Sequence, residues 1–559
     1  MKRIIYYIFA LSCLLFCVSA KAASTLPSLE IKGITGDALK NVQSRLKSEL
    51  AQVDTAYFAS HAPEHIRMAL EPYGYFKAKV NLKQGKTWLI EIDPGPPLTI
   101  AQVDFKLLGP GKDDPEIKNY VAHFPLAAGQ ILRIENYNKM KEDLFQLASN
   151  QGYLKAILEK KEIRVNLKTN TATIIFYFNT GPRYYFGHIL FKPSPFAPHF
   201  LQRFASFKPN EPFSNQKLLK FKQDLQHSRY FQQVEAIPNF DQAKDLNIPI
   251  DVAVTAPKSQ RYDVGIGYGT FTGPRLTLGT DFRRITDTGQ HFNAQLKLSS
   301  VLSRLSAKYY IPGKNPLADQ YILGANIQYF APKNGSSFSE TLSASYQKTV
   351  DDWQNSISVN YLNENYKITG KNSHISQVLY PNLTLSYLKK DNLISPNSGK
   401  MFSLTVQGAS ETFLSKTNFF QTQLKAKAIF SPTQDSRVIL RGDLGYTVVE
   451  NLNQLPLTLR FFAGGIGSVR GYPYSSIGPG KFLQVASAEY QHRIIGNWNG
   501  AIFYDVGNAS DKFNSHFKRG DGAGIVYQSF IGPVKLYVGR ALSKPDKPLS
   551  VEFSIGPEF

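Results

Sequence analysis

The stretch "QTQLKAKAIF", from Gln421 to Phe430, alternates polar and apolar side chains with a period of two residues. One face of an extended strand would carry Leu424, Ala426, Ala428 and Phe430. The opposite face would carry Gln421, Gln423, Lys425 and Lys427. This pattern predicts a β-strand with an apolar environment on one side and water on the other.

The same alternation runs from about Tyr262 to the end of the chain. In "VEFSIGPEF", Val551 to Phe559, the apolar residues alternate with Glu552, Ser554 and Glu558. Repeated over three hundred residues, the pattern predicts an antiparallel barrel with lipid outside and water inside. Turn signals divide residues 259–559 into about sixteen segments, which fits about ten residues per spanning strand. A soluble sandwich is the alternative, but the strand lengths favour the membrane barrel.

The first residues have the organisation of a secretory signal peptide. Met1-Lys2-Arg3 precede an apolar run from Ile4 to Val18 and then "SAKAA", so residues 1–22 are expected to be removed. A membrane anchor is the alternative, although it would need about twenty apolar residues. The two cysteines, Cys13 and Cys17, lie within this segment, so the mature chain should contain no disulfide or zinc–thiolate site.

The formal net charge of +21 favours anionic surroundings. We expect no nucleic acid partner, because the chain is exported and its basic residues are dispersed. Outer-membrane lipid phosphates or acidic partners fit the charge better, and simple solubility is the alternative.

Three similar segments precede the barrel. "YGYFKAKV", "NQGYLKAI" and "HSRYFQQV" place Tyr75, Tyr153 and Tyr230 at nearly equal spacing. Each segment follows a helical pattern and opens a strand, and the order within a unit is strand, helix, helix, strand, strand. Gly-Pro pairs punctuate the units, which predicts small α+β domains at residues 27–97, 98–183 and 184–258. Two helices covering one sheet face would leave a strand edge free for another chain.

The loop "GGIGSVRGYPYSSIGPG", Gly464 to Gly480, carries one arginine, Arg470. Its glycine spacing is not G-x-G-x-x-G and its prolines disfavour a following helix, so no nucleotide or other cofactor is expected. The strand patterns after it turn Glu489 and Asp505 toward the lumen. If the loop folds inward, Arg470 could pair with both carboxylates and hold the loop inside the barrel. A surface loop with a solvated arginine is the alternative.

Taken together, the signal peptide, the repeats, the barrel and the Val-Arg-Gly-Tyr loop resemble the bacterial outer-membrane assembly-factor superfamily. That superfamily includes BamA, TamA and the two-partner secretion transporters, and the three repeats, "VGIGYGTFTGPRLTLG" and "IGPEF" are most similar to TamA. The resemblance implies three periplasmic POTRA repeats and a luminal lock formed by Arg470, Gly471, Tyr472, Glu489 and Asp505. It also implies a TamB-like partner anchored in the inner membrane and unfolded outer-membrane protein clients.

The first and last barrel strands have features of a weak seam. The last strand contains Gly556-Pro557 before the terminal Phe559, and proline cannot donate a ladder hydrogen bond. The first strand has Gly265, Gly267 and Gly269 on its luminal face, which removes side chains that would fix the register. We therefore expect a lateral gate here. The alternative is that these glycines make room for loops in the lumen.

Enzymatic chemistry is not expected. "HAPEH", His61 to His65, matches the H-x-x-E-H zinc pattern, but Pro63 fits best in a first helical turn, which would leave His61 outside the helix. There is no obvious third ligand and no G-x-S-x-G, so neither a metal site nor a serine hydrolase is predicted. The sequence favours a factor that assists insertion or secretion of autotransporter-type proteins. A two-partner secretion transporter and a passive porin are the alternatives.

Overall fold

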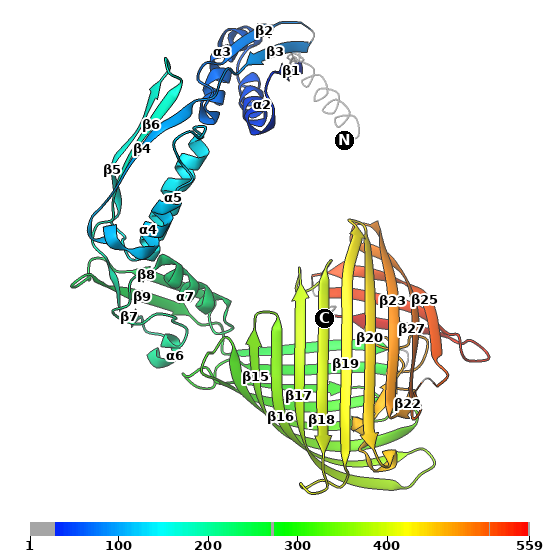
Figure 1. Cartoon of the computed structure of the whole chain (residues 1–559). Coiled ribbons are helices and arrows are strands. Elements are labelled where there is room, and N and C mark those ends of the chain that lie inside the picture. The colour runs from blue at the N-terminus through cyan, green and yellow to red at the C-terminus, as the bar shows by residue number, and fades with distance from the viewer. Residues whose placement is uncertain (1–27, 86, 270–272, 514, 531, 557–559) are drawn as a thin grey trace, which may run out of the picture. The chain divides into compact units, whose positions relative to one another are not determined.

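In the computed structural model, the structure describes residues 28–85, 87–269, 273–513, 515–530 and 532–556. The expected signal peptide, Pro557 and Phe559 lie outside these residues. The chain divides into two compact units, and the division passes within residues 189–250. Three small sheets precede one large sheet (Figure 1). Among the described residues, no helix has the length and apolar character needed to cross a membrane.

The first small sheet has the order β1-β3-β2, with β1 parallel and β2 antiparallel to β3. Its elements are β1 (Ser28–Lys32), α2 (Gly36–Leu50), α3 (Thr55–Leu70), the 3-10 helix η1 (Glu71–Tyr73), β2 (Lys79–Lys83) and β3 (Thr87–Asp93). The helices form because apolar residues recur at four-residue spacing, as in Val42, Leu46 and Leu50. These side chains pack against Ile90 and Ile92 of the central strand.

The prediction that His61 lies outside the helix is wrong. Helix α3 continues through Pro63, and the rings of His61 and His65 lie on one face with centroids 6.3 Å apart. Burial of Phe58, Ala62, Ile66 and Leu70 along a neighbouring stripe of the helix outweighs the cost of the interior proline, about 3 kcal/mol. The described residues nevertheless contain no group of three or more His, Cys, Asp or Glu side chains suited to a metal ion.

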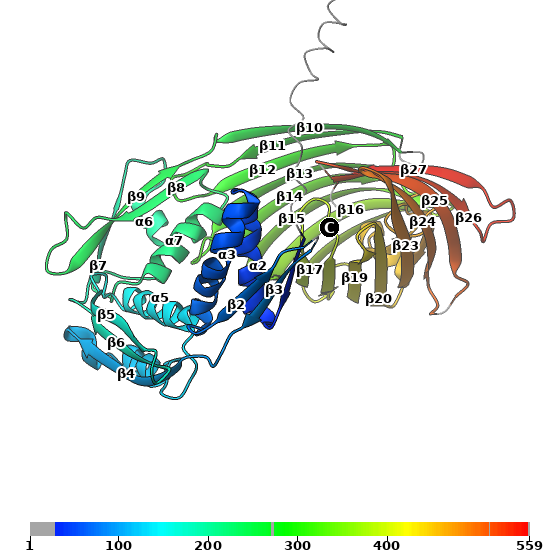
Figure 2. The ribbon, with the colours of Figure 1, turned by 90° about the horizontal axis from the view of Figure 1, so that it is seen from above.

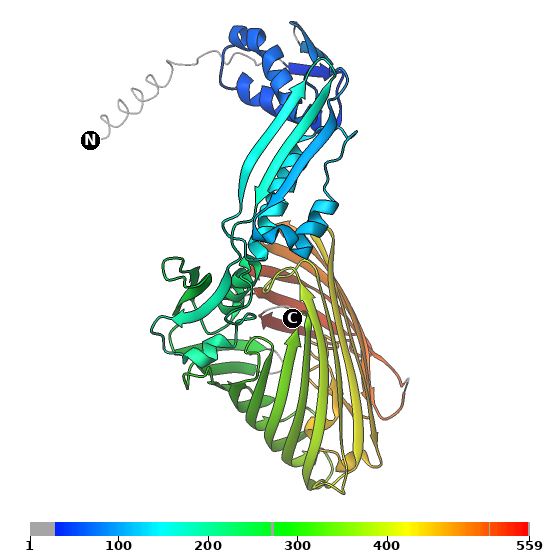
Figure 3. The same cartoon turned by 60° about the vertical axis from the view of Figure 1, so that its left-hand side comes forward.

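The second small sheet repeats this arrangement with the order β4-β6-β5 (Figure 3). Its elements are β4 (Thr99–Leu108), η2 (Pro110–Asp113), α4 (Pro115–Ala122), α5 (Ile134–Asn150), β5 (Ile157–Asn166) and β6 (Thr171–Asn179). Strand β6 is parallel to β4 and antiparallel to β5. Met140 and Leu144 of α5 share a buried core with Ile174 and Phe176 of β6. An amphipathic helix thus covers one face of each three-stranded sheet.

The third small sheet has the order β7-β9-β8. Its elements are β7 (Tyr185–Phe191), α6 (Pro198–Gln202), α7 (Asn215–His227), β8 (Gln233–Pro238) and β9 (Asn247–Thr255). Phenylalanine and tyrosine dominate its packing, and the rings of Phe200 and Tyr230 meet edge to face 5.1 Å apart.

The large sheet contains sixteen antiparallel strands, which confirms the predicted strand count. The strands are β10 (Gln260–Gly269), β11 (Gly273–Phe282), β12 (His291–Leu298), β13 (Leu302–Pro312), β14 (Asp319–Phe330), β15 (Gly335–Val350), β16 (Trp353–Ile368), β17 (Ser373–Lys390), β18 (Gly399–Ala409), β19 (Phe419–Thr433), β20 (Ser436–Val449), β23 (Phe482–Ile495), β24 (Trp498–Ser510), β25 (Lys518–Ser529), β26 (Gly532–Ala541) and β27 (Leu549–Ile555). The sheet curls so that β10 and β27 become neighbours (Figure 2).

Side chains alternate across this wall as the period of two requires. On β10, Tyr262, Val264, Ile266 and Tyr268 are all more than 60% exposed on the outer face. On β20 and β24, Leu444 and Ile502 also point outward, whereas Asp443 and Asp505 point inward. An apolar exterior around a polar interior is the arrangement of a barrel that spans a bilayer.

Candidate functional site: a locked loop inside the barrel and an unpaired seam

Residues 450–481, between β20 and β23, form the loop that reaches into the barrel. The loop contains η3 (Leu452–Gln454), η4 (Leu457–Leu459) and a small hairpin of β21 (Phe461–Ala463) and β22 (Ile477–Gly480). Val469 and Tyr472 pack with Leu483 and Val485 of the inner wall. The hairpin and these apolar contacts hold the Arg470 segment in a defined position.

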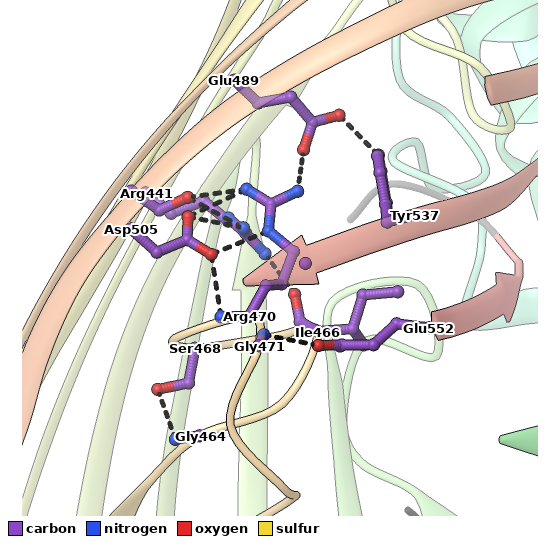
Figure 4. Close-up of polar contacts among 12 residues, drawn as sticks. Arg441, Gly464, Ile466, Ser468, Arg470, Gly471, Glu489, Asp505, Tyr537 and Glu552 are labelled. Carbon is purple, nitrogen blue, oxygen red and sulfur yellow. Dashed lines mark hydrogen bonds and ion pairs between the residues drawn. The ribbon is translucent and has the colours of Figure 1, made fainter. Parts of the chain in front are cut away.

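Arg470 is 1% exposed and meets two carboxylates from adjacent strands (Figure 4). Its Nε and Nη2 donate to Asp505 at 2.7 and 2.9 Å, which makes a bidentate pair. Its Nη1 donates to Glu489 at 2.5 Å. Charge-assisted, bidentate contacts of this kind are among the strongest hydrogen bonds in proteins, so they fix the guanidinium in one orientation.

Aromatic and polar side chains complete the surroundings of this guanidinium. Its central carbon lies 3.5 Å from the centroid of the Phe503 ring and 5.0 Å from that of Tyr537. The hydroxyl of Tyr537 donates to Glu489 at 2.6 Å, and Ser487 accepts from Nη2 at 3.3 Å. A second cation, Arg441, donates to the carbonyl of Ile466 in the same loop. The buried charges are therefore paired and hydrogen-bonded, as a buried ion cluster requires.

Hydrogen bonds hold the backbone of the loop at Arg470 and Gly471, in addition to the Arg470 side chain. The N–H of Arg470 donates to Asp505 at 2.9 Å, and the N–H of Gly471 donates to Glu552 of the last strand, β27, at 2.9 Å. Gly471 has φ +89°, and a Cβ there would overlap the backbone of Arg540. Only glycine fits this position, since it tolerates positive φ and the close approach. Tyr472 is buried, and its hydroxyl accepts from the N–H of Ser543 at 3.2 Å.

Two contacts of this site were not predicted from the sequence. The polar and apolar alternation predicted that Glu552 points inward. Its contact with Gly471 was not predicted, because it depends on the curvature of the whole sheet. The other is a second anchor of the loop, in which the fully buried Glu364 of β16 accepts from the N–H of Thr458 at 3.1 Å. Its only sequence signal is a carboxylate at an inward position of a long strand.

At the seam, residues of β10 and β27 come within 8 Å between Cα atoms. Within the described residues, β10 pairs only with β11 and β27 pairs only with β26. Strand β27 ends at Ile555, and Gly556 follows with φ +141°, a conformation that suits glycine. The two strands thus meet as sheet edges.

The seam glycines are not required by close packing. A Cβ at Gly267 would meet nothing within 4 Å, and one at Gly265 would meet only Thr277 at 3.6 Å. Gly269 is the last residue of β10. The alternative that these glycines make room for loops therefore receives no support at Gly265 and Gly267. At these glycine positions, β10 has no side chain on its luminal face.

Comparisons with known proteins agree with this architecture. The Omp85 superfamily domain matches residues 285–559, and the model described as POTRA domain, TamA domain 1, matches residues 28–94. The fold and the luminal loop are those of an outer-membrane barrel protein. The protein belongs to the Omp85 superfamily, with a first repeat of the TamA type. It is therefore a non-enzymatic outer-membrane factor for protein insertion or secretion.

Solved structures share the fold at low sequence identity. BamA from Haemophilus ducreyi, in a form lacking POTRA domains 1–3, superposes with a TM-score of 0.69 and 16% identity, covering 82% of this chain and 99% of that chain. CdiB from Escherichia coli superposes with a TM-score of 0.50 and 12% identity, covering 93% of this chain and 98% of that chain.

Proposed function

We propose that the protein assists the insertion or secretion of autotransporter-type outer-membrane proteins through a lateral gate between β10 and β27. The observation that carries this proposal is that β10 and β27 meet at the seam with no ladder of hydrogen bonds between their described residues. An unpaired edge offers backbone N–H and C=O groups to a client strand, as in β-strand addition. Opening such a seam breaks fewer hydrogen bonds than opening any other strand pair of the wall.

Two alternatives are less well supported. A passive porin needs an open lumen, whereas this lumen holds a loop anchored on β16, β23, β24 and β27. A two-partner secretion transporter remains a candidate because the fold is shared with CdiB. The TamA-type first repeat favours the assembly factor.

Crosslinking the seam tests the gate. One cysteine at Ser554 of β27 and one at the luminal position of β10 whose Cα lies within about 7 Å of it should form a disulfide that blocks client insertion, and reduction should restore insertion. Lys535 and Ser554 are register partners within the β26–β27 ladder, so the Lys535→Cys/Ser554→Cys pair is a matched control that shares one cysteine. Insertion of an autotransporter-type client into proteoliposomes would be followed over time. A fully crosslinked seam with an unchanged insertion rate would rule out the gate.

The domain division is part of the same proposal. We assign residues 27–97, 98–183 and 184–258 to three POTRA repeats, and the first of them to a TamB-like partner anchored in the inner membrane. Within the part of the chain that the structure describes, β1 and β2 form the two edges of the β1-β3-β2 sheet, and an edge can accept a strand from such a partner.

Deleting residues 27–97 should abolish capture of the TamB-like partner while leaving a folded barrel, because the first sheet has its own core. Co-purification with the partner measures capture, and the different gel mobility of folded and heat-unfolded barrel serves as the folding control. Undiminished capture by the folded truncated protein would contradict the assignment of the first repeat.

A further inference from the structure

Three cations gather on the luminal wall of β12 and β13. Lys297 lies on β12, and Arg304 and Lys308 lie on β13. Leu305, next to Arg304, is 46% exposed on the outer face, so Arg304 and its register partner Lys297 point into the lumen. Lys308 shares this face, because it is four residues from Arg304 along the strand. We call these three residues the luminal cation row.

The row has no carboxylate to balance it. Lys297 and Arg304 stand directly opposite each other, an arrangement in which like charges repel. Arg304 donates through Nε to Gln328 at 2.8 Å, and no described carboxylate lies within 4.0 Å of any of the three cations. The nearby luminal acids are already used, because Asp263 pairs with Arg261 at 2.8 Å and Asp281 lies 3.7 Å from Arg283.

The row lines a cavity of about 400 Å³. The other polar side chains around this cavity are Gln295, Ser306, Asn326, Thr341 and Ser343. A second luminal cavity of about 460 Å³ shares Arg304 and continues the polar wall with Gln328, Gln407, Gln421, Gln423 and Lys425. Its lining also contains Arg460 and one carboxylate, Asp443, which accepts a hydrogen bond from Gln423 at 2.8 Å. Amide and hydroxyl groups can both donate and accept, so this surface can satisfy the N–H and C=O groups of another chain.

A second like-charge pair shows what distinguishes the row. Lys389 of β17 and Lys400 of β18 are also register partners, but they lie on the outer face with Tyr387 and Phe402. At that position water and lipid phosphates can balance their charge. The luminal cation row faces a cavity instead of lipid, and no carboxylate of the described residues lies within 4.0 Å of it.

We propose that the luminal cation row binds an acidic segment of an extended client polypeptide. Arg304, Ser306 and Lys308 follow one another at two-residue intervals, about 7 Å, which is also the repeat of same-face side chains in an extended peptide. Aspartate and glutamate of the client would pair with the cations, and the neighbouring amides and hydroxyls would bind its backbone. This inference rests on the proposed function, in that it specifies the charge of the segment that enters the lumen.

Fluorescence anisotropy on the full-length protein in detergent tests this binding. The probe is a labelled peptide of alternating Glu, Ser and Gly, and a peptide with Gln in place of Glu is the reference. The acidic peptide should bind more tightly than the Gln peptide. Lys297→Gln/Arg304→Gln should weaken it about tenfold, a change equivalent to about 1.4 kcal/mol. Lys389→Gln/Lys400→Gln removes the same charge from the outer face and should leave binding unchanged.

The location of the bound peptide is tested separately. The only cysteines, Cys13 and Cys17, precede residue 28, so Ser306→Cys places a reporter thiol inside the cavity. A maleimide-bearing acidic peptide should label Ser306→Cys faster than Ser358→Cys, which lies elsewhere on the inner wall. Equal labelling, equal affinity of the two double variants, or binding of an acidic oligosaccharide in place of the peptide would overturn the proposal. None of these measurements needs the seam to open, so failure of the gate would be recognised independently.

Discussion

A barrel carrying Arg470→Ala is expected to unfold at a markedly lower temperature than wild type while still being produced and inserted. The substitution removes the cation that lies between Glu489 and Asp505, both of which are almost fully buried, and leaves only the longer ion pair of Asp505 with Arg441, at 3.9 Å. Losing one member of a buried ion pair typically costs about 3 to 5 kcal/mol. The loop would keep its apolar contacts and its hydrogen bonds to Arg441, Glu364 and Ser543, but it would lose its strongest contacts, and activity should fall with stability.

The temperature of conversion from folded to unfolded gel mobility measures this effect. Arg493→Ala is the matched control, because Arg493 pairs with Asp435 at 3.1 Å at an exposed position, where a pair contributes about 0.2 to 1 kcal/mol. Arg470→Lys retains the charge but loses the planar fork, so it should lie between wild type and Arg470→Ala. If Arg470→Ala melted and functioned like wild type, the loop would not be held by this cluster.

Gly520→Ala is expected to displace the loop from the lumen without altering any charged residue. Gly520 lies on β25 beside the lock, and a Cβ there would overlap the carbonyl oxygen of Arg470. The obstructing atom belongs to the backbone, so no side-chain rotation can relieve the clash. Overpacking usually costs about 1 to 3 kcal/mol, and here the lock itself would also be disturbed.

Limited proteolysis of purified protein reports the position of the loop in this variant. We expect cleavage within residues 464–480 in Gly520→Ala at protease concentrations that leave wild type intact. Gly442→Ala is the control, because the nearest atom to its added Cβ would be 4.0 Å away. Protection of the loop in Gly520→Ala equal to that in the control would show that the barrel accommodates the methyl group.

Much of this architecture was predictable because it depends on local periodicity. Alternation at period two identified the strands, and the apolar spacing from Ile134 to Ala148 anticipated α5 (Ile134–Asn150) nearly to its ends. The same alternation predicted that Glu489 and Asp505 point into the lumen. In the structure, both accept hydrogen bonds from Arg470.

The remaining features depend on long-range packing. Pro63 strongly disfavours a helix interior, yet the burial of five apolar residues of α3 overrides this local preference. The contact of Gly471 with Glu552 joins residues 81 positions apart, and that of Glu364 with Thr458 joins residues 94 apart. Such pairings follow from the curvature of the sixteen-stranded sheet. A short stretch of sequence carries no information about that curvature. Likewise, the charge balance of the luminal cation row depends on long-range packing, because the nearby carboxylates Asp263 and Asp281 already lie beside other arginines.

The bond between Gly471 and Glu552 constrains the order in which the barrel can be built. Glu552 belongs to the last strand, whereas Gly471 belongs to a loop that precedes β23. The two residues can therefore meet only when the barrel is nearly closed. If the barrel closed first, the loop would have to enter a confined lumen afterwards. Contacts of such large sequence separation form late and slowly. We therefore expect the loop to be enclosed while the sheet is still open, so that the last strand joins the wall after the loop is in the lumen.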